Sequence, residues 1–423
     1  MIIYTVKSGD SLEKIAAEFS LLPEKILSAN GLGEDEKIPV GAALVIPVNA
    51  QAHIVSAGDS LYSIALKYGT SVDELLLLNP SLRPPYTIYP GNYIAVPEKK
   101  NKREISVLGY AYPTISDKTL EKSLDSLTYI AIFSYTIRAD GSMNAINDDR
   151  IIKTAKEKNV APLLTLTNSS DGDGFSTDTV LEFLNNGDAV DTFVNGIPDF
   201  LKQKGYLGIN VDFEYVSKEG KEQYNEFLKK LSDRLSAEGL ITSVALAPKY
   251  SKEQKGTLYE GHDYKTMGEY CDFIMLMTYE WGYTAGPPLS VSPYSEVKKV
   301  ISYAVSEIPK EKILLGTPNY GYDWTLPYSP GTRAVTVGLS EDIKTAAKYN
   351  SAIRFNESAS APFFTYNDMG RDHIVWFDDA RSIQKRLSLI DEFGLGGVGI
   401  WTINRYFAPY YEILKDYKIK KLL

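Results

Sequence analysis

Three polar side chains recur at every second position in the apolar segment 206–215, where Asn210 is followed by Asp212 and Glu214. Side chains alternate across a β-strand, so these three share one face and the apolar residues between them share the other. Burying such a row is costly unless the protein uses it. Carboxyl groups in an apolar setting exchange protons with bound molecules, so the row marks a candidate site of acid and base chemistry that ends at Glu214.

Other reactive patterns in the chain lack the partners that their chemistry needs. The Gly-Asp-Ser-Leu runs at 9–12 and 58–61 also occur in a family of serine esterases, but no Asp-x-x-His pair accompanies them. Cys271 is the one cysteine and lies in an apolar run, which favours a buried, inert thiol. Residues 394–399 fit G-x-G-x-x-G but lead into a strand instead of leaving one. We expect no metal and no cofactor.

From residue 105 onward, apolar segments of strand length alternate with helical patterns. The eight segments are 105–112, 128–137, 160–168, 206–215, 240–248, 271–280, 312–320 and 396–404. Helices are expected at 121–127, 149–158, 192–204, 221–238 and 294–308. This alternation predicts an α/β fold, a (β/α)8 TIM barrel, with Glu214 at the mouth where barrel enzymes do their chemistry. The long gap before the last strand predicts a small α+β insertion at about 325–376.

The first 97 residues contain one sequence unit twice. The run from Tyr4 to Leu12 aligns with the run from His53 to Leu61 at an offset of 49. Each copy reads as strand, helix, helix, strand, with polar residues in place to cap the first helix. We place the copies at 1–48 and 52–97. The charged run 98–104 reads as a linker to the barrel at 105–423.

The two copies resemble lysin-motif (LysM) domains, which bind glycans that contain N-acetylglucosamine. In that family the sugar lies in a groove between the loop after the first strand and the loop after the second helix. The resemblance implies eight glycan-binding positions: Gly9, Asp10, Ser11, Asn30, Gly58, Asp59, Ser60 and Asn79. The alternative is that these residues only cap helices and build turns.

The segment 207–214 resembles the D-x-x-D-x-D-x-E signature of family 18 glycoside hydrolases. Asp212 and Glu214 match the last two acids, whereas Leu207 and Asn210 replace the first two. Three further runs resemble the sixth, seventh and eighth strands of that family: Met277-Thr278-Tyr279-Glu280 with Glu for Asp, the run from Lys312 to Gly321, and Gly397-Val-Gly-Ile-Trp401. Each run is a weak signal alone, but their order on these strands is a strong one.

The resemblance implies a retaining, substrate-assisted mechanism. Glu214 would be the acid, Asp212 would orient the 2-acetamido group of the sugar, and Tyr279 would hydrogen-bond its oxygen. Trp401 would stack beneath the ring. The remaining implied contacts are Tyr110, Phe133, Glu280 and Tyr320. On the third strand, the run from Thr165 to Asn168 stands where S-x-G-G is usual, so no contact is assigned there.

Asn210 stands where the family often has a second acid. Because Asn cannot ionise, Asp212 has no neighbouring acid here with which to share a proton, unlike family members with Asp at this position. It would instead have a side-chain amide as its neighbour. We therefore expect Asp212 to stay charged more readily than in a pair of acids, with a shift in the acidic limb of the rate profile.

Composition excludes several classes of partner. Forty-five basic against 54 acidic residues give a net charge of −9, so no cationic field attracts nucleic acid or a lipid surface. No apolar run approaches the roughly 20 residues of a membrane helix. The first residues form no secretory signal.

Two LysM copies before a family 18 barrel, without a signal peptide, resemble spore cortex-lytic N-acetylglucosaminidases. That resemblance implies synthesis in the mother cell, deposition in the cortex and coat region of the endospore, and action in germination. The implied partners are peptidoglycan strands and other oligosaccharides that contain N-acetylglucosamine. Two alternatives stay open: a chitinase or another endo-acting N-acetylglucosaminidase, and a non-catalytic glycan-binding scaffold.

Overall fold

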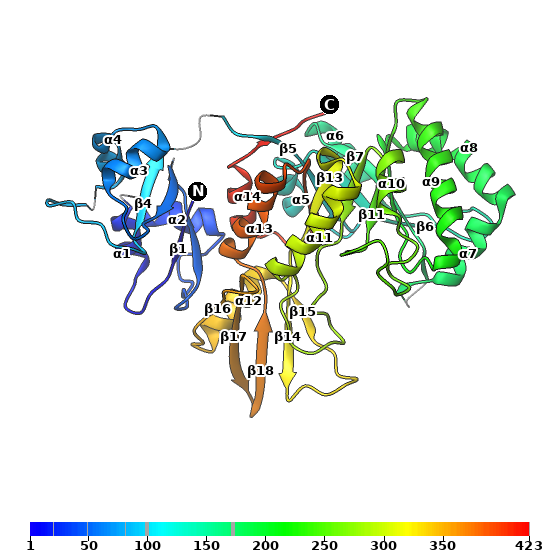
Figure 1. The fold of residues 1–423 in the computed structure, drawn as a ribbon. Helices are drawn as coiled ribbons and strands as arrows, with labels where there is room; N and C mark the ends of the chain where they lie inside the picture. Colours follow the sequence, from blue (N-terminus) through cyan, green and yellow to red (C-terminus); the bar gives the residue numbers. More distant parts are fainter. Residues whose placement is uncertain (20, 49, 81, 98–100, 171–173, 423) are drawn as a thin grey trace.

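The computed structural model describes residues 1–19, 21–48, 50–80, 82–97, 101–170 and 174–422. Its largest sheet is a closed barrel of parallel strands (Figure 1). In order around the barrel these are β5 (Glu104–Ala111), β6 (Tyr129–Thr136), β7 (Ala161–Thr167), β10 (Gly208–Asp212), β11 (Ile241–Leu246), β12 (Phe273–Leu276), β13 (Ile313–Pro318) and β19 (Gly397–Trp401). The last strand pairs with the first, from Gly397 against Ser106 to Ile400 against Gly109. The predicted TIM barrel is confirmed.

Helices pack around the outside of the barrel. They are α5 (Asp117–Leu124), α6 (Asp149–Glu157), α7 (Thr177–Asn185), α8 (Gly187–Lys204), α9 (Lys221–Ser236), α10 (Tyr264–Tyr270), α11 (Tyr294–Glu307), α13 (Ala380–Phe393) and α14 (Ala408–Leu414). Polar caps define several starts, such as Ser116 before α5 and Asp379 before α13. Sequence patterns located five of these nine helices and missed α7, α10, α13 and α14. The chain closes with β20 (Lys418–Ile419), which lies beside the start of β5.

The side chains of β10 alternate as the sequence predicts. Ile209, Val211 and Phe213 belong to the apolar core between barrel and helices. Asn210 and Asp212 point the other way, into an interior that a separate apolar cluster fills, including Tyr110 and Met275. A polar pair inside an otherwise apolar barrel is therefore a local exception that needs partners or a use.

The insertion is an antiparallel sheet with one helix, and it projects below the barrel in Figure 1. Its elements are β14 (Gly321–Leu326), β15 (Val335–Val337), α12 (Leu339–Lys348), β16 (Arg354–Asn356), β17 (Ala361–Asp368) and β18 (Arg371–Trp376). The first strand starts directly after the seventh barrel strand, a few residues earlier than the predicted start at about 325. A smaller hairpin, β8 (Ser169–Ser170) with β9 (Gly174–Phe175), follows β7.

Each N-terminal repeat has the predicted order of strand, helix, helix and strand. The first consists of β1 (Ile2–Thr5), α1 (Leu12–Glu18), α2 (Pro23–Asn30) and β2 (Ala43–Ile46). The second consists of β3 (Ala50–Ile54), α3 (Leu61–Tyr68), α4 (Val72–Leu78) and β4 (Tyr93–Pro97). Of the predicted linker 98–104, residues 98–100 lie outside the described residues.

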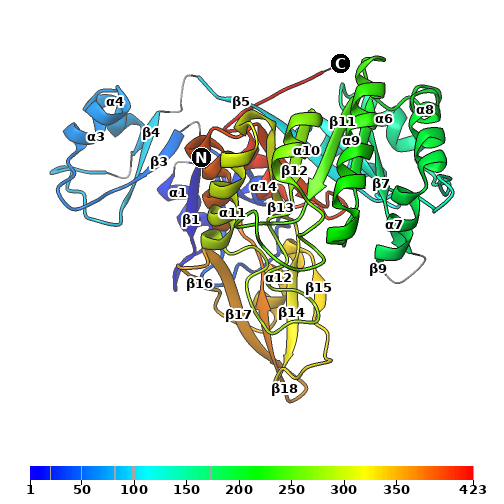
Figure 2. The ribbon, with the colours of Figure 1, turned by 45° about the vertical axis from the view of Figure 1, so that its right-hand side comes forward.

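The first repeat is docked on the barrel and its insertion. Helix α2 packs against α14, and the apolar core of the first repeat is continuous with the core around the barrel. The Ile353 N–H donates to the Val40 carbonyl at 2.9 Å, and the Arg381 guanidinium donates to the Gly41 carbonyl at 2.9 Å. Most of the second repeat's apolar side chains form a cluster of their own. In both views it lies farther from the barrel than the first (Figures 1 and 2).

Candidate active site

A cavity of about 220 Å³ opens at the C-terminal ends of the barrel strands. It brings together six of the residues expected from the sequence: Asp212, Glu214, Tyr279, Glu280, Tyr320 and Trp401. The rest of its wall was not expected and consists of Phe175, Pro248, Leu258, Tyr259, Met277 and Trp281. Carboxyl groups are therefore enclosed by aromatic and apolar side chains, a setting that shifts proton affinity.

Glu214 lies two residues beyond the end of β10, and its backbone is fixed from both sides. The Glu214 N–H donates to the Asn168 amide oxygen at 2.9 Å, and the Asn168 amide donates to the Glu214 carbonyl at 2.8 Å. Behind it, the buried His262 contacts the Phe213 carbonyl through Nε2 at 3.0 Å and accepts the Ala247 N–H at Nδ1. Asn168 thus replaces the family's S-x-G-G run as the third-strand contribution.

The Glu214 carboxyl has the proton affinity that a general acid needs. Burial raises its pKa well above the ordinary value, and repulsion from Asp212 and Glu280 raises it further. Both effects favour the protonated form of Glu214, which lines the cavity, and that is the form a general acid needs.

Asp212 is a buried carboxylate with an unmet hydrogen-bonding capacity. It is 4% exposed, and its Oδ1 has no hydrogen-bond partner among the described residues. Burial raises the pKa of Asp212 to about 7. A buried acceptor left unpaired inside a ligand cavity is ready to accept an N–H from a bound molecule.

Asn210 does not supply an amide to Asp212, and that part of the expectation is wrong. Its amide oxygen accepts the Tyr110 hydroxyl at 2.8 Å, and its amide nitrogen donates to the Ser243 hydroxyl at 2.9 Å. Both partners lie on other strands of the barrel. The oxygen and the nitrogen of the Asn210 amide are therefore already hydrogen-bonded to residues other than Asp212. Asn210 therefore stands as a neutral neighbour of Asp212.

We expect Asn210→Asp to move the acidic limb of kcat/KM to higher pH. The new carboxylate lies two positions from Asp212 on the same face, and like charges raise the pKa of the coupled pair. Activity that needs ionised Asp212 is then lost at a higher pH as the solution is acidified. Asn210→Ala removes the same two hydrogen bonds without adding a charge, so its limb should stay at the wild-type position. An unmoved limb in Asn210→Asp contradicts the prediction.

Tyr279 presents a hydroxyl donor to the cavity. No hydrogen bond among the described residues engages this hydroxyl, and burial raises its pKa well above the ordinary value, so it keeps its proton. Thr278, the preceding residue, fixes its position by donating through Oγ1 to the Gly316 carbonyl. The Thr278 carbonyl in turn accepts the Ser292 hydroxyl at 2.6 Å.

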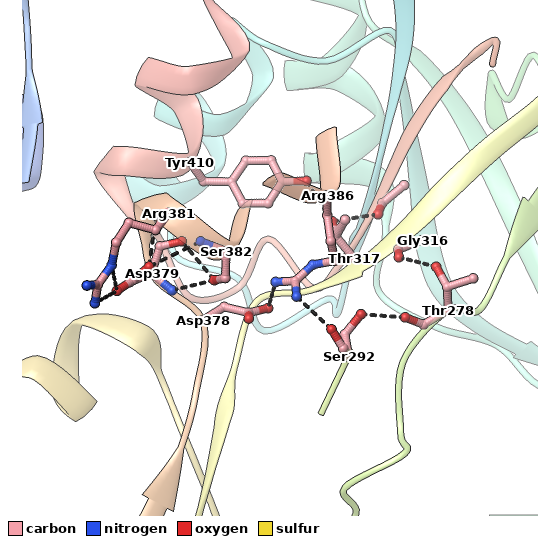
Figure 3. A network of polar contacts seen from close by, with 11 residues as sticks. Thr278, Ser292, Gly316, Thr317, Asp378, Asp379, Arg381, Ser382, Arg386 and Tyr410 are labelled. Atoms are coloured by element: carbon pink, nitrogen blue, oxygen red, sulfur yellow. Dashed lines mark hydrogen bonds and ion pairs between the residues drawn. The ribbon is translucent and has the colours of Figure 1, made fainter. Parts of the chain in front are cut away.

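This support continues into a fully buried ion pair (Figure 3). The Arg386 guanidinium donates to the Ser292 carbonyl at 2.7 Å and pairs with Asp378. Arg386 lies on α13, and Asp378 lies just after β18, the last strand of the insertion. The network therefore ties the insertion to the loop that carries Tyr279.

Glu280 is held by two tyrosines of the insertion side. Its Oε1 accepts the hydroxyls of Tyr320 and Tyr322, the latter at 2.7 Å. Its backbone adopts φ 69°, a left-handed conformation that costs a non-glycine residue about 1 kcal/mol or more. Burial raises the pKa of Glu280, whereas the two hydroxyls oppose that shift. Sequence reasoning found Tyr320 but not Tyr322.

Trp401 is half-buried, and aromatic edges fix its ring. Its centroid lies 4.8 Å from Phe133, 5.4 Å from Tyr110 and 5.8 Å from Tyr112, all at steep interplanar angles. Trp401 lines the cavity, but Tyr110 and Phe133 are not among the residues that do. Both rings hold the Trp401 ring in place, and their direct contact with a sugar stays a prediction.

A sequence model of glycosyl hydrolases family 18 matches residues 97–405. The chain belongs to glycosyl hydrolase family 18. Within this family it is a glycoside hydrolase with LysM domains matched at residues 4–47 and 53–97.

Relatives of this family 18 hydrolase include proteins of similar length. It is 36% identical to a cortical fragment-lytic enzyme of Bacillus anthracis over 98% of this chain and 97% of the relative. The crystal structure of the Bacillus megaterium QM B1551 spore cortex-lytic enzyme SleL is similar with a TM-score of 0.90, 39% identity and coverage of 100% and 99%. A chitinase from Chromobacterium violaceum ATCC 12472 is similar over 74% of this chain and 98% of its own, with 25% identity and a TM-score of 0.68.

The eight LysM positions expected to bind glycan have structural roles in this hydrolase, and their contact with a glycan stays a prediction. Asn30 and Asn79 are 6% and 9% exposed. The side-chain amide of each is hydrogen-bonded to backbone groups of its own domain. Ser11 and Ser60 cap α1 and α3, and Gly9 and Gly58 turn the chain at positive φ. Asp10 and Asp59 accept the N–H groups of Lys7 and Ser56. The two asparagines therefore shape the domain from inside.

Reactive groups outside the cavity are few in the described part of the hydrolase. Cys271 is buried as expected, and burial raises the pKa of its thiol to about 12, which disfavours the reactive thiolate. Among the described residues, no group of three His, Cys, Asp or Glu side chains is placed to hold a metal ion. Within the same residues, no helix has the length and apolar character needed to cross a membrane.

Proposed function

We propose that this family 18 hydrolase cleaves spore cortex peptidoglycan after N-acetylglucosamine and acts in germination. The observation that carries the proposal is the buried Asp212 Oδ1, which has no hydrogen-bond partner among the described residues, in a cavity that Glu214 and Trp401 also line. A 2-acetamido sugar offers the N–H that this oxygen lacks. Similarity to the cortical fragment-lytic enzyme of Bacillus anthracis and the spore cortex-lytic enzyme of Bacillus megaterium supports the cortex as the substrate.

In the first step Glu214 donates its proton to the glycosidic oxygen, and the bond from that oxygen to the anomeric carbon breaks. The carbonyl oxygen of the sugar's own acetamide forms a new bond to the anomeric carbon, which gives a bicyclic oxazolinium ion. Asp212 accepts the acetamide N–H and offsets the developing positive charge. Tyr279 donates its hydroxyl to the acetamide oxygen, and Trp401 stacks beneath the ring.

In the second step Glu214, now ionised, takes a proton from water. The resulting nucleophile attacks the anomeric carbon and breaks the bond to the acetamide oxygen. The product keeps its anomeric configuration, and the proton taken from water restores the acid form of Glu214. One carboxyl thus serves as acid and then as base, while the substrate supplies the nucleophile.

The same chemistry favours N-acetylglucosamine over muramic units at the cleaved position. Muramic lactam has its nitrogen tied into a ring, so it offers no free acetamide to attack. The lactyl ether of N-acetylmuramic acid adds bulk beside the acetamide in an enclosed cavity. The LysM domains would hold the glycan strand, and the exposed turns at Gly9 and Gly58 are the surfaces we assign to that contact.

Product analysis tests the proposal. Purified cortex peptidoglycan is digested, the products are reduced with borohydride, and the reduced sugar is identified by mass spectrometry. We expect N-acetylglucosaminitol. N-acetylmuramitol would identify a muramidase, and no product would identify a scaffold. Cleavage confined to chitin oligomers would identify a chitinase. As a control, the same fragments with the N-acetyl group removed at the cleaved unit should resist the enzyme.

A further inference from the structure

A second cavity adjoins the active site. Its volume is about 500 Å³, and it shares Glu280, Tyr320 and Trp401 with the first cavity. Its other lining residues come from the loops after β5, β13 and β19 and from the insertion: Tyr112, Thr114, Asn319, Tyr322, Thr336, Thr402, Asn404 and Arg405. Trp401 thus borders both spaces. A glycan whose cleaved sugar lies over Trp401 has room for a neighbouring sugar here.

Arg405 brings a positive charge to this second cavity. Among the described residues that line it, Arg405 alone is basic. Within the described ranges, no hydrogen bond or ion pair engages its guanidinium, and the residue is exposed. Its stem crosses Gly338 at the start of α12, where a Cβ would lie 3.2 Å from the Arg405 Cδ. The side chain is therefore supported along its length while its charged end is free.

The acidic groups near Arg405 do not neutralise it. The Glu280 carboxylate is already held by the hydroxyls of Tyr320 and Tyr322. Asp342 is fully buried, and burial raises the pKa of its carboxyl well above the ordinary value, which favours the uncharged form. The charge of Arg405 reaches the cavity wall, because it opposes the effect of burial on the pKa values of Tyr112 and Tyr322. Although the protein has a net charge of −9, the positive charge of Arg405 makes this cavity a candidate binding site for an anion.

Resting on the proposed function, we propose that Arg405 binds a carboxylate carried by the sugar next to the cleaved N-acetylglucosamine. The lactyl ether of a muramic unit, or a short peptide attached through it, ends in such a carboxylate. A guanidinium fork fits a carboxylate with two parallel hydrogen bonds. The polar residues Asn319, Asn404, Thr336 and Thr402 line the same cavity. Chitin has no carboxylate, so this subsite selects peptidoglycan.

The test compares one peptidoglycan fragment in two forms, with its carboxylates free and with them blocked as amides. We expect the wild-type enzyme to prefer the free form in kcat/KM by about tenfold to 100-fold, the range for a charged hydrogen-bonded pair. Arg405→Gln should lose this preference by raising KM for the free form, with the blocked form changed less than about threefold. Arg405→Lys should keep part of the preference, and added salt should reduce it.

Matched variants and substrates separate this subsite from the function on which it rests. Arg371→Gln removes an exposed arginine at the far end of the insertion sheet and should keep the wild-type preference. Equal losses on both substrate forms in Arg405→Gln would make Arg405 merely structural and overturn the subsite. Equal wild-type rates on the two forms would overturn the subsite and leave the proposed function standing. Wild-type cleavage of chitin oligomers but of neither fragment would refute both.

Discussion

Glu214→Gln should lower kcat on peptidoglycan fragments by about 10²- to 10⁴-fold, the contribution of a general acid. Gln keeps the size of the side chain, and the backbone contacts with Asn168 do not depend on the carboxyl. The variant should therefore fold and bind substrate with a similar KM. A fragment whose leaving group is a 4-nitrophenol needs no proton from the enzyme to depart, so its first step should lose far less. Stopped-flow release of nitrophenol measures that step.

The control for Glu214→Gln is a second Glu on the outside of the barrel. Glu222 lies exposed on α9, and Glu222→Gln makes the same chemical change away from the cavity. It should keep wild-type kcat. Full activity in Glu214→Gln would assign the proton donor to another carboxyl, and Glu280 would be the next to test because it lines the same cavity.

Gly41→Ala should destabilise the protein far more than Gly91→Ala, although the two glycines are equivalent positions of the two repeats. Both have positive φ, 84° and 88°, so alanine strains the backbone similarly at each. At Gly41 a Cβ would lie 1.8 Å from the Ile353 carbonyl oxygen, whereas at Gly91 nothing lies within 4 Å. Overpacking of this kind costs about 1–3 kcal/mol beyond the shared strain.

Urea unfolding followed by tryptophan fluorescence measures this difference, with limited proteolysis as a second readout. Gly41→Ala should lower the midpoint more than Gly91→Ala and expose new cleavage sites in the first repeat. The Gly91 variant provides the matched control, since it carries the strain without the contact. Equal midpoints for the two variants would mean that the first repeat is not held in the docked position.

The barrel was predictable because each of its strands is an apolar run between helical patterns. The candidate site was predictable where its residues alternate along one short run, as Asp212 and Glu214 do, or belong to runs with a family resemblance, as Tyr279 and Trp401 do. Tyr110 and Phe133 stay predicted sugar contacts; the structure places both rings against Trp401. Alternation fixes the face on which a residue lies, but it does not say which neighbour covers it.

The rest of the site depends on contacts between distant segments, which local patterns do not encode. Tyr259 and Trp281 enter the cavity from loops without strand or helix periodicity. The partners of Asn210 lie on β5 and β11, 100 and 33 residues away in sequence. The one sequence signal for Asn168 was that it belongs to the run that differs from S-x-G-G. Only the fold shows that its amide is hydrogen-bonded to the backbone of Glu214.

The docked first repeat changes what a truncation can teach. A barrel produced from residue 105 alone would uncover the apolar side chains of α14 and Ile353 that the first repeat now covers. Such a fragment should self-associate, because association with a second copy would bury the newly exposed apolar surface. Any lower activity of this fragment would then reflect aggregation as well as the loss of glycan binding by the LysM domains. Substitutions in exposed turns of the intact chain separate the two effects, since they leave that face covered.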